Sequence, residues 1–197
     1  AYFGVTKISK PNPGDTVIVT GAAGGVGSLA GQIFKIAGCN VYGIAGGKEK
    51  CEMLINDFGF DGAIDYKSED LNESLGKLCP NGADIVYDNV GGRILNDCLL
   101  HLALNARIAI CGIISRHKTD NMNFGPENYS NLIFKRATMQ GFLMLDYVSE
   151  TVSARNKMKK WIEDGKLICK EDLREGFEKA PDTLKGRFDG KMKGKQR

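Results

Sequence analysis

A chain of 197 residues with 42% hydrophobic and 26% charged residues has enough apolar material for one packed domain, which excludes intrinsic disorder as a description of the whole chain. Its 25 glycines follow no collagen period and come with only 5 prolines, which excludes a fibrous protein. The formal net charge is +3, and the basic residues between Lys185 and Arg197 are typical of a solvated terminus, so we expect no nucleic-acid partner.

Turn residues and apolar spacing divide the first 165 residues into alternating strands and helices. Short β-branched or apolar runs predict strands at residues 16–20, 41–45, 63–65, 84–90, 107–113 and 138–145. Helical spacing predicts helices at residues 26–38, 49–58, 68–78, 93–102, 128–135 and 148–163. Strands separated by helices of this length pair in parallel through right-handed crossovers, so the predicted fold class is α/β with a doubly wound parallel sheet.

The last predicted helix and the segment after it differ from the rest. The helix at 148–163 is amphipathic, and we expect Val152, Trp161 and Ile162 to pack against the sheet. Beyond it the alternation stops, so residues 166–197 are interpreted as a separate piece with little core of its own.

The cysteines and hydropathy indicate where the protein works. Six cysteines are scattered without a Cys-x-x-Cys pair, and only His101 and His117 could assist them, so we expect no metal site. The first residues show no signal pattern, and no apolar run approaches the roughly 18 residues of a membrane span. We therefore expect a cytoplasmic protein with free thiols and no membrane partner.

A run of small residues from Gly21 to Gly27 separates the first predicted strand from the first predicted helix. In this position glycines let the backbone approach a pyrophosphate, and the helix N-terminus offers N–H groups to it. The alternative is a tight turn whose small residues serve packing alone. Because seven consecutive small or glycine-like positions exceed what a turn needs, the pattern favours nucleotide binding.

The end of the second predicted strand indicates which dinucleotide binds. NAD enzymes of this architecture carry an acidic residue here for the ribose 2′-hydroxyl, whereas this chain has Gly46 and Gly47 followed by Lys48 and Lys50. The missing side chains leave room for a 2′-phosphate, which favours NADP as the cofactor. Glu49 keeps NAD open, as does the possibility that these charges are only the solvated first turn of a helix.

Two other nucleotide-binding classes fit the glycine turn but fail elsewhere. A short-chain dehydrogenase needs a tyrosine with a lysine four residues later, and no tyrosine of this chain has one. A methyltransferase sheet needs an acidic residue after the second strand, where Gly46 and Gly47 stand.

Eight motifs in order resemble one family over nearly the whole chain. They are the segments 1–4, 21–28, 43–51, 59–61, 65–67, 88–92, 111–115 and 139–142. With these motifs the chain resembles the zinc-independent medium-chain dehydrogenase/reductases, in particular the NADPH-dependent double-bond reductases of the curcumin, prostaglandin and leukotriene reductase type. The resemblance implies a Rossmann domain that binds NADP.

The resemblance also implies roles for single residues. Lys50 would pair with the 2′-phosphate, Tyr66 would lie beside the adenosine half, and Asn89 would line the nicotinamide. The other implied cofactor-binding residues are Gly24, Gly25, Val26, Gly27, Gly46, Cys111, Gly112, Ile113 and Ser115. Asn89 and Cys111 each follow a predicted strand, so both lie where doubly wound sheets bind ligands. The alternatives are an Asx turn at Asn89 and a buried structural thiol at Cys111.

The chain departs from the family pattern in two ways. Met192 stands where the family has an asparagine beside the nicotinamide, and the family's N-terminal catalytic domain is missing. The resemblance therefore divides the chain into residues 1–10 as a junction to that domain, 11–165 as the NADP-binding domain and 166–197 as a C-terminal remnant of the catalytic domain.

The resulting functional hypothesis is the cofactor half of an enone or alkenal reductase. Hydride would pass to the β-carbon of a small unsaturated carbonyl and a proton would reach the α-carbon. Tyr147, after the last predicted strand, is the candidate catalytic residue on the substrate side, or else an aromatic that packs at a helix start. The rival is a nucleotide-binding module without catalysis. A homodimer stays open.

Overall fold

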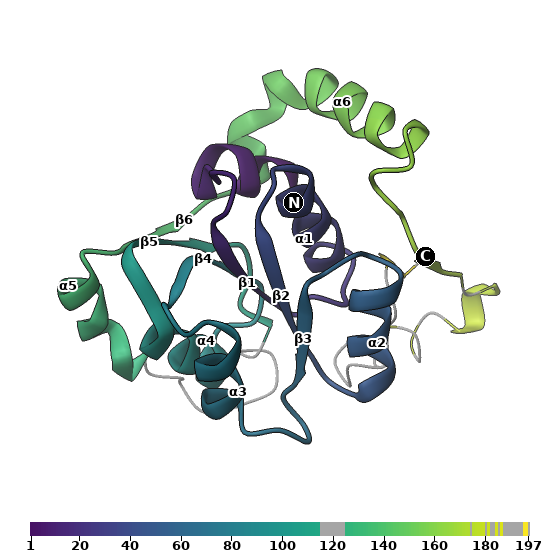
Figure 1. The fold of residues 1–197 in the computed structure, drawn as a ribbon. Helices are drawn as coiled ribbons and strands as arrows, with labels where there is room; N and C mark the ends of the chain where they lie inside the picture. The colour runs from purple at the N-terminus through teal and green to yellow at the C-terminus, as the bar shows by residue number, and fades with distance from the viewer. Residues whose placement is uncertain are drawn as a thin grey trace.

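The computed structural model describes residues 1–114, 125–173, 175–179, 181, 184, 186 and 195–196. Six parallel strands form one sheet in the order β3-β2-β1-β4-β5-β6 (Figure 1). Their bounds are β1 Thr16–Thr20, β2 Asn40–Ala45, β3 Gly62–Asp65, β4 Ala83–Asp88, β5 Leu102–Ile110 and β6 Thr138–Gly141. This confirms the predicted doubly wound sheet. The strand order reverses between β1 and β4, and sheets of this kind bind ligands at such a switch point.

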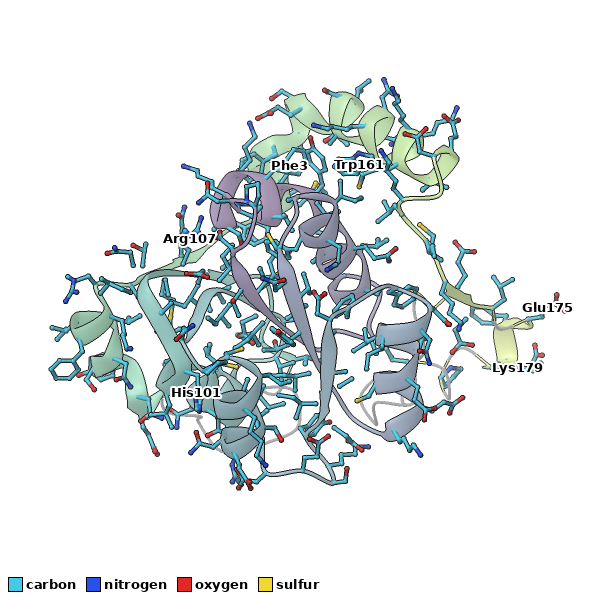
Figure 2. All side chains as sticks on the ribbon, viewed as in Figure 1. Phe3, His101, Arg107, Trp161, Glu175 and Lys179 are labelled. Atoms are coloured by element: carbon cyan, nitrogen blue, oxygen red, sulfur yellow. The ribbon has the colours of Figure 1, made fainter. Side chains whose placement is uncertain are left out.

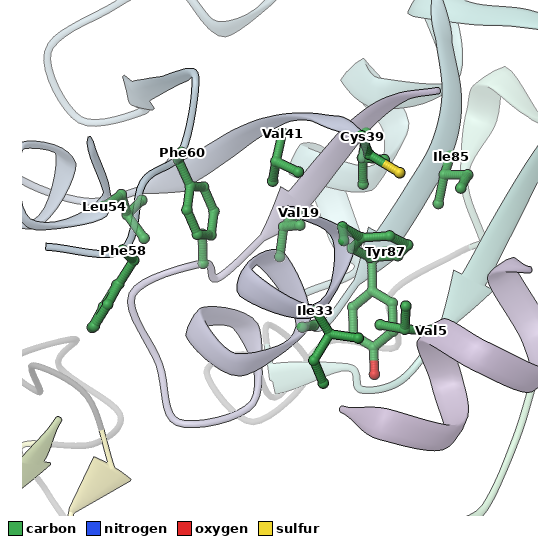
Figure 3. Packing of buried hydrophobic residues seen from close by; sticks show 14 of the residues in the cluster. Val5, Val19, Ile33, Cys39, Val41, Leu54, Phe58, Phe60, Ile85 and Tyr87 are labelled. Atoms are coloured by element: carbon green, nitrogen blue, oxygen red, sulfur yellow. The ribbon is translucent and has the colours of Figure 1, made fainter. Parts of the chain in front are cut away.

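Helices cover both faces of the sheet and enclose two hydrophobic cores. Their bounds are α1 Gly27–Ile36, α2 Lys48–Asn56, α3 Leu71–Leu78, α4 Gly92–Cys98, α5 Asn131–Lys135 and α6 Thr151–Glu163. On β1, Val17 and Val19 face the core under α1 and α2, while Ile18 faces the core under α3 and α4. Figure 3 shows Val19 in the first of these cores, near Ile33 of α1 and Leu54 of α2. All three β1 side chains are fully buried, so the strand is buried on both faces as its apolar run predicted.

Several predicted bounds were wrong by a few residues, for local reasons. The strand predicted at 84–90 ends at Asp88, because the Asp88 carboxylate accepts the N–H groups of Val90 and Gly91 and turns the chain. The strands predicted at 107–113 and 138–145 end at Ile110 and Gly141, which are the last residues paired with each other. The strand predicted at 107–113 also begins earlier, at Leu102.

Short 3-10 helices and one short pair of strands lie between and after these elements. Leu99–His101 continues α4, Glu127–Ser130 leads into α5, and Met144–Glu150 leads into α6, each as a 3-10 helix. The helices predicted at 93–102, 128–135 and 148–163 therefore each span two elements. Near the C-terminus, β7 Glu171–Asp172 pairs with β8 Lys195–Gln196, and a 3-10 turn spans Phe177–Lys179.

The first ten residues form a helix, Gly4–Ser9, which sequence patterns did not predict. Val5 and Ile8 on this helix join the core under α1. At its end, the Arg107 guanidinium on β5 donates to the carbonyls of Ser9 and Lys10 and to the Asp15 carboxylate (Figure 2). The Arg107 side chain therefore ties the N-terminal segment of the chain to the sheet.

Helix α6 packs differently from the prediction. Val152 and Ile162 are 69% and 47% exposed, so they do not pack against the sheet, whereas Trp161 does contact the core under α1. The buried residue of the helix is Ala154, and the Trp161 ring lies next to the Tyr2 ring, with centroids 5.9 Å apart. Among the described residues, no helix is both long and apolar enough to cross a membrane.

The segment after α6 is tied to α1. The Leu167 side chain is buried in the core under α1, and the Gln32 side chain binds both the N–H and the carbonyl of Ile168, at 2.7 and 3.0 Å. The start of the 166–197 piece thus contributes to the core of the sheet domain.

Candidate cofactor site

The candidate site lies where β1 and β4 end side by side. Thr20 ends β1, and its hydroxyl donates to the Asp88 carboxylate at 2.6 Å and accepts the Asn89 N–H at 2.9 Å. The Asn89 side-chain amide donates to the Thr20 carbonyl at 2.8 Å. Asn89 is therefore held across the switch point by β1 and makes no Asx turn.

The glycine turn after β1 brings α1 close to the strand. A Cβ on Gly27 would stand 2.4 Å from the Gly21 carbonyl oxygen and 2.8 Å from the Ala22 Cα, both backbone atoms that cannot move aside. A Cβ on Gly24 would be 3.4 Å from the same carbonyl oxygen. Gly27 is thus required for helix–strand packing, whereas Gly24 with the half-buried Gly25 and the exposed Val26 forms the open part of the turn.

Asp88 supports this corner and was not assigned a role from the sequence. Its side chain is fully buried and accepts hydrogen bonds from Thr20, Val90 and Gly91. Burial raises the pKa of Asp88, and these hydrogen bonds oppose that rise. The sequence did contain a signal for this role, since Asp88 ends an apolar strand shortly before two glycines. A carboxylate buried at a strand end is tolerated only when it accepts hydrogen bonds.

A second corner lies at the ends of β2 and β3. No acid ends β2, as predicted, but Asp65 at the end of β3 reaches this place and accepts the Gly47 N–H at 2.7 Å. The same carboxylate accepts the Lys67 N–H at 3.1 Å and the Ser68 hydroxyl at 2.9 Å. The Gly47 hydrogen bond is the main cause that lowers the pKa of Asp65. Sequence reasoning missed this residue because its partner Gly47 lies 18 residues away.

We call the turns after β2 and β3 the phosphate corner, because they hold the residues expected to lie near the 2′-phosphate and the adenosine half. Gly46 follows β2 directly and lies against the Tyr66 ring, since a Cβ on Gly46 would stand 2.9 Å from the Tyr66 Cε1. Lys50 lies in the first turn of α2 and is half-buried. No side chain caps the N-terminus of α2, and helix N-termini of this kind favour anions.

The third part of the site is an open pocket of about 480 Å³ at the ends of β5 and β6, lined by Ile110, Cys111, Gly112, Ile113, Gly141, Phe142, Leu143 and Asp146. The N–H groups of Cys111 and Gly112 donate to the Asp88 carbonyl at 2.7 and 3.2 Å, which joins this segment to the Asn89 corner. Cys111 is only half-buried, so it is not a fully buried structural thiol. Ser115 and Met192 lie outside the described residues.

Tyr87 packs next to a residue that lines this pocket, since its ring centroid lies 6.5 Å from that of Phe142. The Tyr87 side chain is fully buried, and burial is the main cause that raises the pKa of its phenol, with a smaller contribution from the Cys111 thiol. The hydroxyl also approaches the N-terminal segment, because a Cβ on Gly4 would stand 2.6 Å from it.

Tyr147 is placed beside the site without lining the pocket. Its ring stacks on the buried Phe3 ring, with centroids 4.9 Å apart and an interplanar angle of 14°. Asp146, its neighbour, is the residue that lines the pocket. The assignment of Tyr147 as a catalytic residue stays a prediction.

The stacked pair predicts which part of Tyr147 stabilises the fold. Tyr147→Phe keeps the ring and should leave the free energy of unfolding within about 0.5 kcal/mol of the original. Tyr147→Ala removes the stack and should cost about 2 kcal/mol. Urea denaturation measures both. A loss in the phenylalanine variant as large as in the alanine variant would show that the hydroxyl, and not the ring, is the stabilising group.

In the described part of the chain, no group of three or more histidine, cysteine, aspartate or glutamate side chains is arranged to hold a metal ion. The cysteines described have no disulfide partner.

The chain matches known proteins along its whole length. The family model described as zinc-binding dehydrogenase matches residues 25–161. The NADP-dependent 2-alkenal reductase of Nicotiana tabacum is 42% identical over 100% of this chain and 57% of its own, and the NADPH-dependent curcumin reductase of Escherichia coli is 38% identical over 99% and 58%. The structure of CurA from Vibrio vulnificus in complex with NADPH superposes with a TM-score of 0.93 at 42% identity, over 99% of this chain and 59% of that one.

The chain thus spans just under three fifths of the length of these relatives. The match to the family model covers more than half of the chain and includes the strands β2 to β6 with the turns between them, while β1 lies just before the matched range. The chain therefore belongs to the zinc-binding dehydrogenase family, and its relatives belong to the zinc-independent branch of NADP-dependent double-bond reductases that its motifs predicted.

Proposed function

We propose that this chain is the NADPH-binding part of an oxidoreductase that reduces the C=C bond of α,β-unsaturated carbonyl compounds. The observation that carries the proposal is the continuous row of turns at the strand ends: the glycine turn after β1, the Gly46 corner after β2, Asn89 after β4 and the Cys111 pocket after β5. The names of the alkenal and curcumin reductases support the reaction class.

The residues present fit NADPH. Gly46 leaves a space that a Cβ would fill, and the turn from Gly24 to Val26 leaves the backbone open in front of α1. The N-termini of α1 and α2 both begin without a side-chain cap, so both can accept the negative charge of phosphate groups. Asp65 lies near the phosphate corner, and its oxygens accept three hydrogen bonds, from the Gly47 N–H, the Lys67 N–H and the Ser68 hydroxyl. Because these donors face its negative charge, Asp65 repels a phosphate less than a carboxylate without hydrogen bonds would.

Each turn has one task in this proposal. The glycine turn holds the pyrophosphate on backbone N–H groups, and Lys50 pairs with the 2′-phosphate. Asn89, fixed by Thr20, and the segment 111–113 orient the nicotinamide, and Phe142 and Leu143 form the apolar wall next to it. When bound, NADPH supplies the hydride for the β-carbon of the substrate.

A binding module without catalysis is the second candidate. The observation that favours it is the open pocket, which the described residues line from one side. Reduction of an unsaturated carbonyl by the chain itself would exclude this second candidate.

The cofactor preference can be measured directly. Calorimetric titration should show tighter binding of NADPH than of NADH, because a charge-assisted contact with a phosphate contributes about 1.5–3 kcal/mol. Lys50→Ala should therefore narrow the preference about tenfold or more. The matched control is Lys77→Ala, since Lys77 is exposed on α3 and pairs with Glu73. Equal affinities for the two cofactors in the unmodified chain would contradict the proposal.

A further inference from the structure

Lys67 lies across the phosphate corner, although no motif assigned it a role. It follows β3 directly, and its side chain passes over Gly46: a Cβ on Gly46 would stand 2.9 Å from the Lys67 Cε. The Tyr66 Cε1 lies at the same distance from that point. The lysine stem and the tyrosine ring therefore share the space that the missing side chain of Gly46 leaves.

The backbone of Lys67 is held in place by Asp65. One Asp65 oxygen, Oδ1, accepts both the Gly47 N–H and the Lys67 N–H, at 2.7 and 3.1 Å. This carboxylate thereby joins the turn after β2 to the turn after β3. A side chain that starts from a fixed backbone loses less conformational freedom when it contacts a ligand.

The ammonium of Lys67 is available for a ligand. Within the described ranges, no carboxylate lies within ion-pair distance of it, while Lys48 at the start of α2 is paired with Glu52 at 3.7 Å. The Asp65 oxygens accept hydrogen bonds from the backbone N–H groups of Gly47 and Lys67 and from the Ser68 hydroxyl, and the charge of Lys67 contributes to lowering the pKa of Asp65. The Lys67 side chain is exposed.

We propose that Lys67 is a second specificity-determining residue for the 2′-phosphate, contacting it from the β3 side while Lys50 contacts it from α2. The proposal rests on the proposed NADPH function. Gly46 gives the Lys67 stem and the Tyr66 ring their room, Asp65 positions the Lys67 backbone, and the ammonium adds a charge that favours a ligand with a 2′-phosphate over NADH. Lys67 is thus expected to affect the choice between the two cofactors rather than dinucleotide binding in general.

The test is calorimetry with the unmodified chain, three variants and three probes. The unmodified chain, Lys67→Ala, Lys67→Arg and the control Lys77→Ala are titrated with NADPH, NADH and adenosine 2′,5′-bisphosphate. Lys67→Ala should bind NADPH and the bisphosphate about tenfold more weakly and NADH unchanged, since one charged contact is lost. Lys67→Arg should keep most of the affinity, and Lys77→Ala should bind all three probes like the unmodified chain.

Three results would overturn the proposal. Unchanged NADPH binding by Lys67→Ala would show that the ammonium does not contact the phosphate. An equal loss for NADPH and NADH would show that Lys67 only supports the fold of the corner. If the unmodified chain binds NADPH no better than NADH, the proposed function itself fails, and that failure is visible without any variant.

Discussion

Gly27→Ala is expected to lower the free energy of unfolding by about 3 kcal/mol and to abolish cofactor binding. The added Cβ would stand 2.4 Å from the Gly21 carbonyl oxygen and 2.8 Å from the Ala22 Cα. Because both contacts are to backbone, the strain cannot be relieved by a side-chain rotation, and α1 must move away from β1. The movement also separates the N-terminus of α1 from the glycine turn. Urea denaturation and NADPH titration measure the two effects.

Gly24→Ala is the matched control for this substitution. Its Cβ would lie 3.4 Å from the same carbonyl oxygen, at the edge of ordinary contact, so the fold should keep its stability within about 1 kcal/mol. Equal stability of the two variants would mean that α1 does not need to approach β1 as closely as the structure shows. If Gly24→Ala keeps its stability but no longer binds NADPH, the added methyl group blocks the pyrophosphate without disturbing the fold.

The second large expected effect is that this chain reduces enones at least about 10⁵-fold more slowly than a complete relative. Holding a substrate in reactive geometry contributes about 7–11 kcal/mol to catalysis, and each 1.36 kcal/mol is tenfold in rate. The described residues form only one wall of the 480 Å³ pocket, so bound NADPH would meet a substrate that is free to move. The assay follows NADPH consumption with a simple alkenal, once calorimetry has shown that the cofactor is bound.

The Escherichia coli curcumin reductase is the comparison enzyme for that assay, because it is 38% identical and of greater length. Comparable rates would contradict the prediction and place the substrate site within these 197 residues. Low turnover with normal NADPH binding is the expected result.

Local patterns predicted the centre of this fold and failed at its edges. The apolar run at β1 and the glycine turn need no distant partner to be recognised, and both were predicted correctly. The helix at Gly4–Ser9 was missed because its stability comes from Val5 in a core formed by distant strands. Val152 was placed on the sheet because an amphipathic pattern says which residues share a face, not what that face meets.

The same distinction applies to the candidate site. Gly46 was assigned from its position after a strand, and the roles of Lys50, Tyr66 and Asn89 came from the family resemblance. Asp65 and Lys67 act through the turn of another strand, and no spacing along the chain shows that their turn meets Gly46. Residues whose role depends on the meeting of two loops could be found only from the structure.

The pairing of β1 with β4 has a consequence for how the protein is made. The hydrogen bond from Thr20 to Asp88 joins residues that are 68 positions apart. At a synthesis rate of about 5–20 residues per second, β1 leaves the ribosome roughly 3–14 s before its partner strand. During that interval one edge of β1 has no neighbour, and unpaired strand edges are sites of aggregation. The crevice between β1 and β4, on which the proposed function depends, can therefore form only after Asp88 has been made, and until then the free edge of β1 needs protection.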